Sequence, residues 1–368
     1  MVTYDGFGPE KIVEIYHPKS GMRGFVVLDN LSLGPAKGGV RMTPSVTVEE
    51  VSRLARAMTW KNAIAELPFG GGKAGIIADD KDMSAKEKEE FVRAFAEGMK
   101  IVSPHLYVSA PDMNMAEEEM RIYATVIGSK KACTGKPKDM GGIPHELGST
   151  GFGLYHATKV ACKHYGLDLK KATFAVEGFG NVGWFVAKYL TEAGAKLVAV
   201  SDSRGVIYSD KGLNFAKLAK VKQEKGTVTA YGEGKVLPSM EIKKVKADIL
   251  VTAAIPDLIN AGDVDEMKFK IIIEGSNIPM VQEVEELFHK KGVLVVPDFV
   301  ANAGGVISSY VEYIGKKEKD MWKMVEEKIT KNTKMVLDLA KKNKVSPREC
   351  AMNIAKERVL AKCDICRI

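Results

Sequence analysis

The sequence lacks the features that mark membrane, secreted or metal-clustering proteins. No apolar run reaches the ~18 residues that a membrane-spanning helix needs, and the charged N-terminal segment has no apolar core of a secretory signal. Five cysteines among 368 residues are too few for a disulfide framework, so we expect a cytoplasmic protein. Cys363 and Cys366 form a lone C-x-x-C without further ligands nearby, and no metal site is predicted.

The composition is that of an ordinary globular protein. Apolar residues make up 45% and charged residues 27% of the chain, and a mass of 40.1 kDa suits two domains. The net charge of +7 is spread over segments such as 85–100, where lysines alternate with glutamates. This pattern indicates solvated helix faces rather than a basic stripe, so we expect neither a nucleic acid nor a membrane as a partner.

The most informative stretch runs from Gly34 to Gly75, where three lysines have neighbours that are unusual for surface lysines. Lys37 precedes two glycines, Lys61 lies near the end of an apolar-periodic segment, and Lys73 follows three glycines. A lysine taken singly is ordinarily a solvated surface charge, and that alternative stays open for each. However, glycine lets backbone N–H groups approach a ligand closely, and a neighbouring ammonium attracts an anion. The three together indicate a cleft for a small anionic substrate.

Periodicity and capping signals place these lysines on elements. Thr47 with Glu50 predicts a capping box and a helix to about Glu66, followed by a loop through the glycine run. Ser84 with Glu87 caps a further helix. Asp112 follows a short strand and is either the cap of a helix starting near Met115 or a catalytic carboxylate. The strands expected in this half cover residues 24–29, 37–42, 73–77 and 106–109.

The second half alternates strands and helices, and its first turn carries glycines at a meaningful spacing. A predicted strand at 173–177 leads into a G-x-G-x-x-G, then a helix, then a strand at 196–201 that ends at Asp202. In that context the glycines allow a tight turn, close approach to a pyrophosphate and close helix packing. The helix N-terminus supplies N–H donors to the phosphates. The turn predicted to bind a dinucleotide consists of Gly178, Phe179, Gly180, Asn181, Val182 and Gly183.

Later strands end in small or polar residues that should line the same cofactor site. Strands expected at 247–252, 271–274 and 293–296 end at Ala253-Ala254, at Asn277 and at the segment 298–305, respectively. The glycine- and proline-rich segment 134–148 reads as a boundary between domains. We therefore predict an α/β protein of two domains. Residues 1–148, joined by a C-terminal helix at about 340–368, form a substrate-binding and oligomerisation domain, and residues 149–339 form a Rossmann-like dinucleotide-binding domain.

With these motifs placed, the chain resembles the Glu/Leu/Phe/Val dehydrogenase family from about Gly34 to Val359, and its glutamate-specific members most closely. The resemblance rests on GPAKGGVRM, MTWKNAIAELPFGGGKAGI, APDMNM, EGFGNVG, IIIEGSN and VPDFVANAGGVISSY. It implies reversible NAD(P)-dependent oxidative deamination of L-glutamate to 2-oxoglutarate and ammonium. It also implies a homo-oligomer, generally a hexamer or octamer. A non-catalytic Rossmann sensor is the alternative from another class.

The resemblance also implies roles at matching positions. Lys73 is similar to the lysine that polarises the 2-oxo carbonyl and activates water, and Asp112 to the aspartate that transfers protons to and from the amino group. Lys61, with the backbone of Gly70 and Gly71, is similar to the clamp for the substrate α-carboxylate. Thr150, Asn277 and Asn302 match positions that face the nicotinamide end of the cofactor.

Substrate and cofactor choice rest on a few further residues. Family members that act on glutamate have a lysine at the position of Lys37, and Ser309 matches a serine that supports the same side-chain carboxylate. The chain is closer in length to the branched-chain members, and Met-Asn-Met follows Asp112 where glutamate-specific members usually have a small or hydroxyl residue at the third place. The alternative is therefore the same reaction on a branched-chain or aromatic amino acid. Asp202 would accept hydrogen bonds from the ribose of NAD, whereas Ser203 and Arg204 could hold the 2′-phosphate of NADP.

Overall fold

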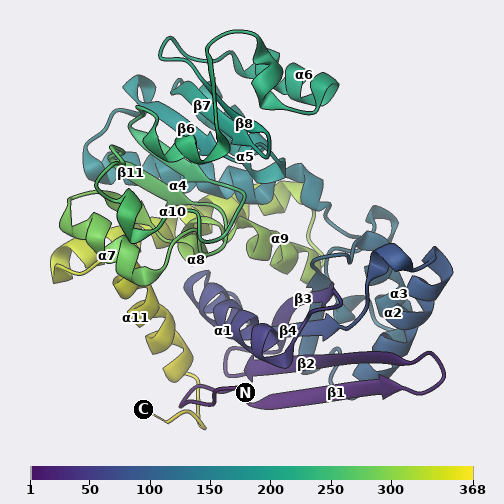
Figure 1. The fold of residues 1–368 in the computed structure, drawn as a ribbon. Helices are drawn as coiled ribbons and strands as arrows, with labels where there is room; N and C mark the ends of the chain where they lie inside the picture. The colour runs from purple at the N-terminus through teal and green to yellow at the C-terminus, as the bar shows by residue number, and fades with distance from the viewer. Residues whose placement is uncertain (1, 368) are drawn as a thin grey trace. The chain divides into compact units, whose positions relative to one another are not determined.

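The computed structural model describes residues 2–367 (Figure 1). The chain divides into two compact units. The first contains the residues up to Leu147, Val306–Met321 and the residues from Asn353 on; the second contains Gly148–Gly305 and Trp322–Met352. The sequence had assigned Val306–Met321 to the dinucleotide-binding domain, whereas its contacts lie mainly within the first unit.

The first unit is built on a five-stranded mixed sheet of order β1-β2-β4-β3-β5. β3 pairs in parallel with β4 on one side and with β5 on the other, while β1 and β2 run antiparallel. The elements of this unit are β1 (Lys11–His17), β2 (Met22–Asn30), β3 (Ala36–Met42), α1 (Val48–Ile64), β4 (Gly70–Ile76), α2 (Ala85–Met99), β5 (Tyr107–Pro111) and α3 (Glu117–Ile127).

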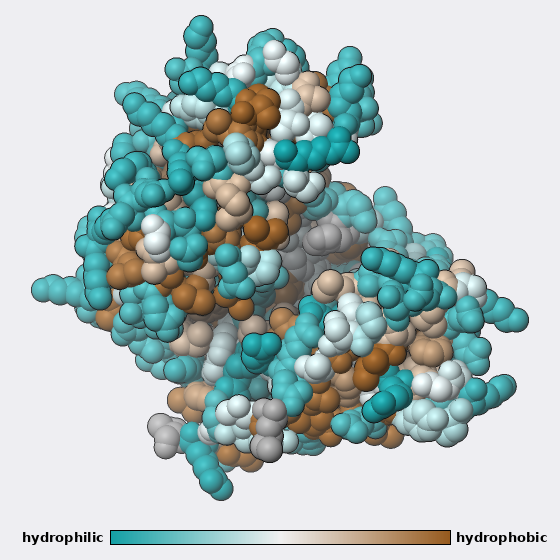
Figure 2. Space-filling view, in the orientation of Figure 1, coloured by the Kyte–Doolittle hydropathy of each residue, from teal (hydrophilic) through white to brown (hydrophobic). Residues whose placement is uncertain are grey.

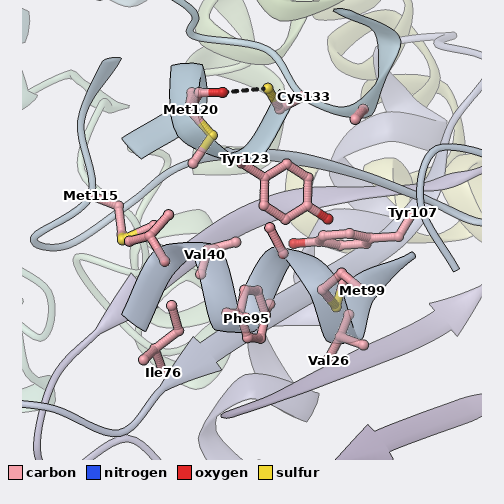
Figure 3. Packing of buried hydrophobic residues seen from close by; sticks show 14 of the residues in the cluster. Val26, Val40, Ile76, Phe95, Met99, Tyr107, Met115, Met120, Tyr123 and Cys133 are labelled. Carbon is pink, nitrogen blue, oxygen red and sulfur yellow. Dashed lines mark hydrogen bonds between the residues drawn. The ribbon is translucent and has the colours of Figure 1, made fainter. Parts of the chain in front are cut away.

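The two faces of this sheet are covered by different helices, as the two-residue period of a strand requires. Val26 and Leu28 of β2 belong to the main core with residues of α2 and α3, and Figure 3 shows part of this packing. Phe25 and Val27 point to the opposite face and pack with Val51 and Ala55 of α1. The sheet is therefore a central layer between α1 and the α2–α3 pair.

The second unit contains a seven-stranded sheet of order β12-β11-β10-β6-β7-β8-β9. The five strands from β12 to β7 are parallel, which confirms the expected doubly wound α/β fold, while β8 and β9 add an antiparallel edge that the sequence analysis missed. Its elements are α4 (Ser149–Tyr165), β6 (Thr173–Glu177), α5 (Asn181–Glu192), β7 (Lys196–Asp202), β8 (Gly205–Tyr208), α6 (Phe215–Lys225), β9 (Lys235–Leu237), β10 (Ile249–Thr252), β11 (Ile271–Glu274), α7 (Gln282–Lys290), β12 (Leu294–Val296) and α8 (Asp298–Ala301).

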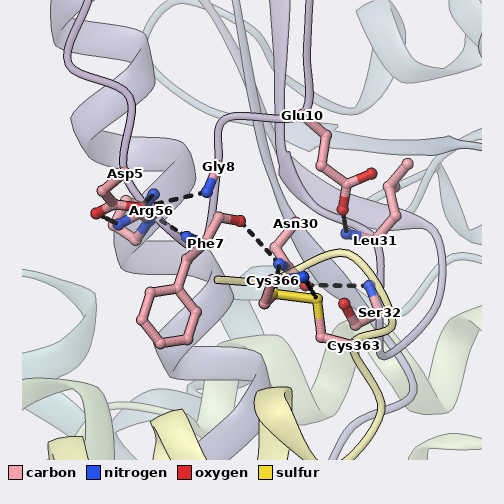
Figure 4. The surroundings of a disulfide bond; sticks show 10 residues. All are labelled: Asp5, Phe7, Gly8, Glu10, Asn30, Leu31, Ser32, Arg56, Cys363 and Cys366. Carbon is pink, nitrogen blue, oxygen red and sulfur yellow. Dashed lines mark hydrogen bonds and ion pairs between the residues drawn. A yellow bond between two sulfur atoms is a disulfide. The ribbon is translucent and has the colours of Figure 1, made fainter. Parts of the chain in front are cut away.

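The last three helices carry the chain between the units. The unit boundaries fall within the residues of α9 (Gly304–Tyr313), α10 (Glu318–Asn343) and α11 (Pro347–Leu360). After α11, Cys363 and Cys366 form a disulfide, where the sequence analysis had expected reduced cysteines (Figure 4). The main-chain N–H of Arg367 donates to the carbonyl of Gly6, which ties this end of the chain to the N-terminal segment.

Charged and polar residues cover much of the visible surface, as Figure 2 shows. Within the described residues, no helix is both long and apolar enough to cross a membrane.

Candidate active site

Lys73 and Asp112 form an ion pair on the sheet of the first unit. Lys73 lies in the middle of β4, Asp112 directly follows β5, and β3 runs between these strands. The Lys73 Nζ is 2.8 Å from Oδ2 of Asp112. The intervening residue of β3 is Gly39, where an added Cβ would lie 2.8 Å from Asp112 Cβ and 3.3 Å from Lys73 Nζ. Because any side chain at Gly39 would crowd the pair, the glycine keeps this position open.

The structure removes the helix-cap interpretation of Asp112. The next helix, α3, begins at Glu117 and its N-cap is Ala116, so Asp112 lies well before it. Burial raises the pKa of the Asp112 carboxyl, but the Lys73 ammonium and the Arg41 guanidinium outweigh burial and hold the pKa below its usual range. Asp112 is therefore an anion at neutral pH, held next to a cation.

Arg41 and Glu50 extend this ion pair, and sequence analysis did not identify either as a site residue. Arg41 Nε donates to Asp112 Oδ2 at 2.9 Å, and Arg41 Nη1 pairs with Glu50 on α1. Thr47 caps α1 as predicted by accepting from the Glu50 N–H, but the Glu50 side chain contacts Arg41 instead of completing a capping box. A two-residue period along β3 from Gly39 is the signal that could have found Arg41.

Lys37 is buried on the same strand, two residues before Gly39. Its side chain is 3% exposed, and its Nζ donates to the carbonyl oxygen of Ser109 at 3.2 Å. Burial lowers the pKa of Lys37 to about 7, although the nearby Glu312 carboxylate favours the charged form. The surface interpretation of Lys37 is therefore excluded.

Lys61 and the glycine run meet at the end of α1. Lys61 lies in the last turn of this helix, and Asn62 Nδ2 donates to the Gly70 carbonyl at 2.8 Å. Gly70 and Gly71 lie inside β4, so the predicted loop through the glycine run is wrong. A Cβ on Gly71 would come within 2.0 Å of Thr59 Oγ1, so glycine is needed here for the close packing of α1 on the sheet.

Ser309 lies on α9, one turn before a strongly held carboxylate that sequence analysis missed. Glu312 accepts hydrogen bonds from the main-chain N–H groups of Gly135 and Ile143, at 3.0 Å each, and pairs with Lys136 Nζ at 2.5 Å. These contacts hold the segment after α3 against α9. Among the described residues no hydrogen bond joins Ser309 to Lys37, so the shared role of these two residues stays a prediction.

A cavity of about 710 Å³ also lies in this unit, lined by residues 130, 131, 136, 138, 140–144 and 312–318. It includes Lys136 and Glu312 but none of the residues predicted for substrate binding or catalysis. The cavity therefore adds nothing to the assignment of the catalytic pair.

The glycine turn of the second unit has the geometry that a dinucleotide requires. Gly178 adopts a φ of 87°, which favours glycine. An added Cβ at Gly183 would lie 1.8 Å from the Gly178 oxygen, whereas one at Gly180 would meet nothing within 4 Å. Gly183 is thus required for packing, and Gly180 leaves open space beside the N-terminus of α5. Asn181 and Val182 form the first turn of that helix, while Phe179 is buried against Phe215.

The carboxylates of Glu177 and Asp202, at the ends of β6 and β7, accept hydrogen bonds from loops near this turn. Glu177, which sequence analysis missed, accepts from the N–H groups of Ala253 and Ala254 at 3.0 Å each, and burial raises its pKa. Asp202 Oδ2 accepts from Lys222 Nζ at 2.7 Å and from the Val228 N–H at 2.8 Å. Burial raises the pKa of Asp202, but these donors outweigh it and the pKa is lowered.

The sequence suggested that the Asp202 carboxylate is open to accept hydrogen bonds from a ribose. In the structure both of its oxygens already accept hydrogen bonds from the protein. Its Oδ1 also accepts from the Arg204 N–H at 3.0 Å and from Thr227 Oγ1 at 3.2 Å. The next two residues, Ser203 and Arg204, are exposed.

Asn302 donates hydrogen bonds to the loop that follows β11. Its Nδ2 donates to the Gly275 carbonyl and to Asn277 Oδ1, at 3.2 Å each, while its buried Oδ1 has no partner among the described residues. Thr150, in the first turn of α4, lies near the segment that follows Asn302, because a Cβ on Gly305 would be 3.1 Å from the Thr150 Oγ1. The unpartnered Oδ1 of Asn302 and the open space at Gly180 both lie on the second unit, and both fit a nicotinamide dinucleotide.

Comparison with known proteins decides the family. The family description "Glutamate/Leucine/Phenylalanine/Valine dehydrogenase" matches residues 141–364, and the "Glu/Leu/Phe/Val dehydrogenase, dimerisation domain" matches residues 9–127. The chain belongs to the Glu/Leu/Phe/Val dehydrogenase family. The resemblance stated from its motifs is thereby confirmed.

Individual members of the family cover nearly the whole chain. A glutamate dehydrogenase of Aeropyrum pernix is 42% identical over 90% of this chain and 83% of its own length. One of Thermotoga maritima is 40% identical over 91% and 84%, respectively. The solved hetero-hexameric glutamate dehydrogenase of Thermus thermophilus, in its Leu-bound form, is 28% identical with a TM-score of 0.85, over 96% of this chain and 89% of that one.

A further cluster in this dehydrogenase supports the loops predicted to bind the cofactor, and sequence analysis did not foresee it. Arg348 on α11 contacts three buried carboxylates of the second unit, those of Glu274, Glu285 and Asp298. Asp298 in turn accepts from the N–H of Ile278, next to the predicted nicotinamide-facing Asn277. These partners are far apart in sequence, so no local pattern could have revealed the cluster.

Proposed function

We propose that this dehydrogenase catalyses the reversible NAD(P)-dependent oxidative deamination of L-glutamate. In this reaction glutamate, water and NAD(P)⁺ give 2-oxoglutarate, ammonium, NAD(P)H and a proton. The substrate assignment rests on one observation, the fully buried Lys37 ammonium in the same sheet as the Lys73–Asp112 pair. Relatives at 40–42% identity that are named glutamate dehydrogenase support it.

Lys37 explains why a dicarboxylate is preferred. A buried ammonium with one hydrogen bond to a carbonyl retains unused donors, and burial disfavours its charge despite the nearby Glu312 carboxylate. A γ-carboxylate would supply both a counter-ion and acceptors, whereas an aliphatic side chain would leave the ammonium unpaired. In this proposal Ser309 donates to the same carboxylate, and Lys61 with the main chain of Gly70 and Gly71 holds the α-carboxylate.

Lys73 and Asp112 are proposed to move the protons of the reaction. The turn from Gly178 to Gly183 would hold the dinucleotide, which would supply the hydride chemistry at the substrate α-carbon. Asp112, an anion at neutral pH, takes a proton from the α-amino group before oxidation and returns protons to the departing ammonia. Lys73 donates a hydrogen bond to the oxygen at the substrate C2 and positions the water that attacks there.

The second unit is proposed to hold the dinucleotide with the groups described above. Glycine N–H groups and the N-terminus of α5 bind the pyrophosphate, Thr150, Asn277 and Asn302 face the nicotinamide, and the segment from Asp202 to Arg204 meets the adenosine ribose. Ala253 and Ala254, held by Glu177, lie beside the same glycine turn. The first unit then binds the substrate and makes the subunit contacts.

We also propose a cytoplasmic homo-oligomer, most simply a hexamer. A dimerisation-domain match to residues 9–127 and a hexameric structural relative support the assembly, and light scattering after gel filtration tests it.

A spectrophotometric panel tests the proposed reaction. Purified protein is mixed with NAD⁺ or NADP⁺ and one of glutamate, leucine, norvaline, phenylalanine or tryptophan, and the absorbance at about 340 nm reports the reduced cofactor. We expect glutamate to have the highest kcat/KM. A preference for leucine or an aromatic amino acid would instead support the alternative substrate class, and no activity with any would support a sensor.

A further inference from the structure

Arg41 contacts Asp112, and the proposed proton transfers give this contact no role. β3 and β4 pair Arg41 with Gly75, and β3 and β5 pair Val40 with Pro111, so one further step along the register brings Arg41 opposite Asp112. The side chain of Arg41 is 13% exposed. The strand pairing therefore aims a largely buried guanidinium at the proposed proton carrier.

Both cations act on the same oxygen of Asp112. Lys73 Nζ is 2.8 Å from Oδ2, and Arg41 Nε donates to Oδ2 at 2.9 Å. No hydrogen bond to Oδ1 occurs among the described residues. A carboxylate with one oxygen clamped by two cations has a fixed orientation, and its second oxygen retains lone pairs that can accept a proton.

Arg41 is itself held from the other side by α1. Its Nη1 pairs with the Glu50 carboxylate, which lies in the first turn of that helix. A guanidinium can contact two carboxylates at once through separate nitrogens, which a lysine cannot do with the same geometry. The row Glu50–Arg41–Asp112–Lys73 is thus a fixed alternation of charges across α1, β3, β5 and β4.

We propose that Arg41 is a positioning residue that clamps Oδ2 of Asp112 and thereby dedicates Oδ1 to proton exchange with the substrate nitrogen. This inference rests on the proposed amino-acid dehydrogenase reaction and adds a residue to it. Arg41 also stabilises the charged form of Asp112, together with Lys73. Tyr107 is a further titratable group close to Asp112.

Three variants and one control separate positioning from a merely structural role. Arg41→Met removes the clamp and its charge, Arg41→Lys keeps the charge without the fork, and Glu50→Gln loosens Arg41 from α1. Arg53→Met is the matched control, because Arg53 is an exposed arginine of the same helix α1. For each we measure kcat and KM for the amino acid against pH, the NAD(P)H dissociation constant, and the melting temperature.

The expected result is specific to the clamp. Arg41→Met lowers kcat by roughly tenfold or more, which corresponds to about 1.4 kcal/mol, and moves the acid limb of kcat/KM to higher pH, since Asp112 loses a cation that favours its anion. Arg41→Lys restores the acid limb and part of kcat, and Glu50→Gln lowers kcat less than Arg41→Met. NAD(P)H binding is unchanged in all, and Arg53→Met behaves as wild type.

The outcomes also separate this inference from the proposed function. A wild-type kcat and acid limb in Arg41→Met would overturn the positioning role while leaving the dehydrogenase reaction intact. If wild type oxidises another amino acid instead of glutamate, the same comparison is made with that substrate. If it oxidises none, crystal structures of wild type and Arg41→Met decide: we expect Asp112 to change rotamer in the variant, and an unmoved carboxylate would overturn the clamp.

Discussion

Lys37 Nζ donates one hydrogen bond within the described residues, to the carbonyl oxygen of Ser109 on the neighbouring strand at 3.2 Å. An ammonium has three donors, and this one is 3% exposed, so water cannot serve the others freely. Burial accordingly lowers the pKa of Lys37 to about 7, with Glu312 opposing and Lys136 and Lys73 reinforcing the shift. The residue that selects the substrate in our account is therefore one whose charge changes near neutral pH.

A pH dependence of substrate binding follows from this pKa. The γ-carboxylate of glutamate binds the charged form of Lys37, and that form predominates only below a pH of about 7 in the free enzyme. We expect the KM for glutamate to rise with pH between about 7 and 8.5, by at most tenfold per pH unit. The KM for norvaline, which lacks the carboxylate, should stay flat or fall over the same range. Parallel KM profiles for the two substrates would contradict a role for Lys37 charge.

The catalytic pair can be tested independently of cofactor binding. We expect Lys73→Ala and Asp112→Asn each to lower turnover by at least about a thousandfold, since general acid–base groups contribute typically ~10²–10⁴-fold. NAD(P)H fluorescence titration should give dissociation constants close to wild type, because the glycine turn belongs to the second unit. Lys86→Ala, at an exposed lysine of α2, serves as the control. Ordinary turnover in either variant would remove that residue from the mechanism.

The two glycines of the dinucleotide turn should respond in opposite ways. Gly180→Val adds a side chain where the structure has open space, so we expect a near-normal melting temperature but at least tenfold weaker NAD(P)H binding. Gly183→Ala puts a Cβ 1.8 Å from the Gly178 oxygen, so we expect a lower melting temperature as well. If Gly180→Val binds NAD(P)H as tightly as wild type, the pyrophosphate does not lie where we propose.

The sequence predicted those parts of the protein that depend on local patterns. The strand-turn-helix around Gly178 and the helix cap formed by Ser84 with Glu87 are both as expected, because each is decided within a few residues. Lys37 and Lys73 could be identified as candidate site residues because each lies directly beside a glycine run, which is also a local pattern. The family motifs then gave these residues roles.

The parts that sequence missed depend on contacts between distant residues. Gly70 was predicted to lie in a loop because glycine weakens a strand interior. It lies instead in β4, where an added side chain would not fit. Arg41, Glu312 and Arg348 acquire their roles only from carboxylates or loops brought close by the fold. A single sequence contains no local signal for such pairings.

The most direct test of the account compares kcat/KM for glutamate and norvaline in wild type and Lys37→Leu. Losing one partner of a desolvated charge pair costs ~2–5 kcal/mol, and ~1.4 kcal/mol is a factor of ten. We therefore predict that Lys37→Leu lowers kcat/KM for glutamate by roughly 30-fold or more and raises the relative activity on norvaline or leucine. A wild type that prefers leucine, or a variant that keeps its efficiency with glutamate, would contradict the assignment of glutamate as the substrate.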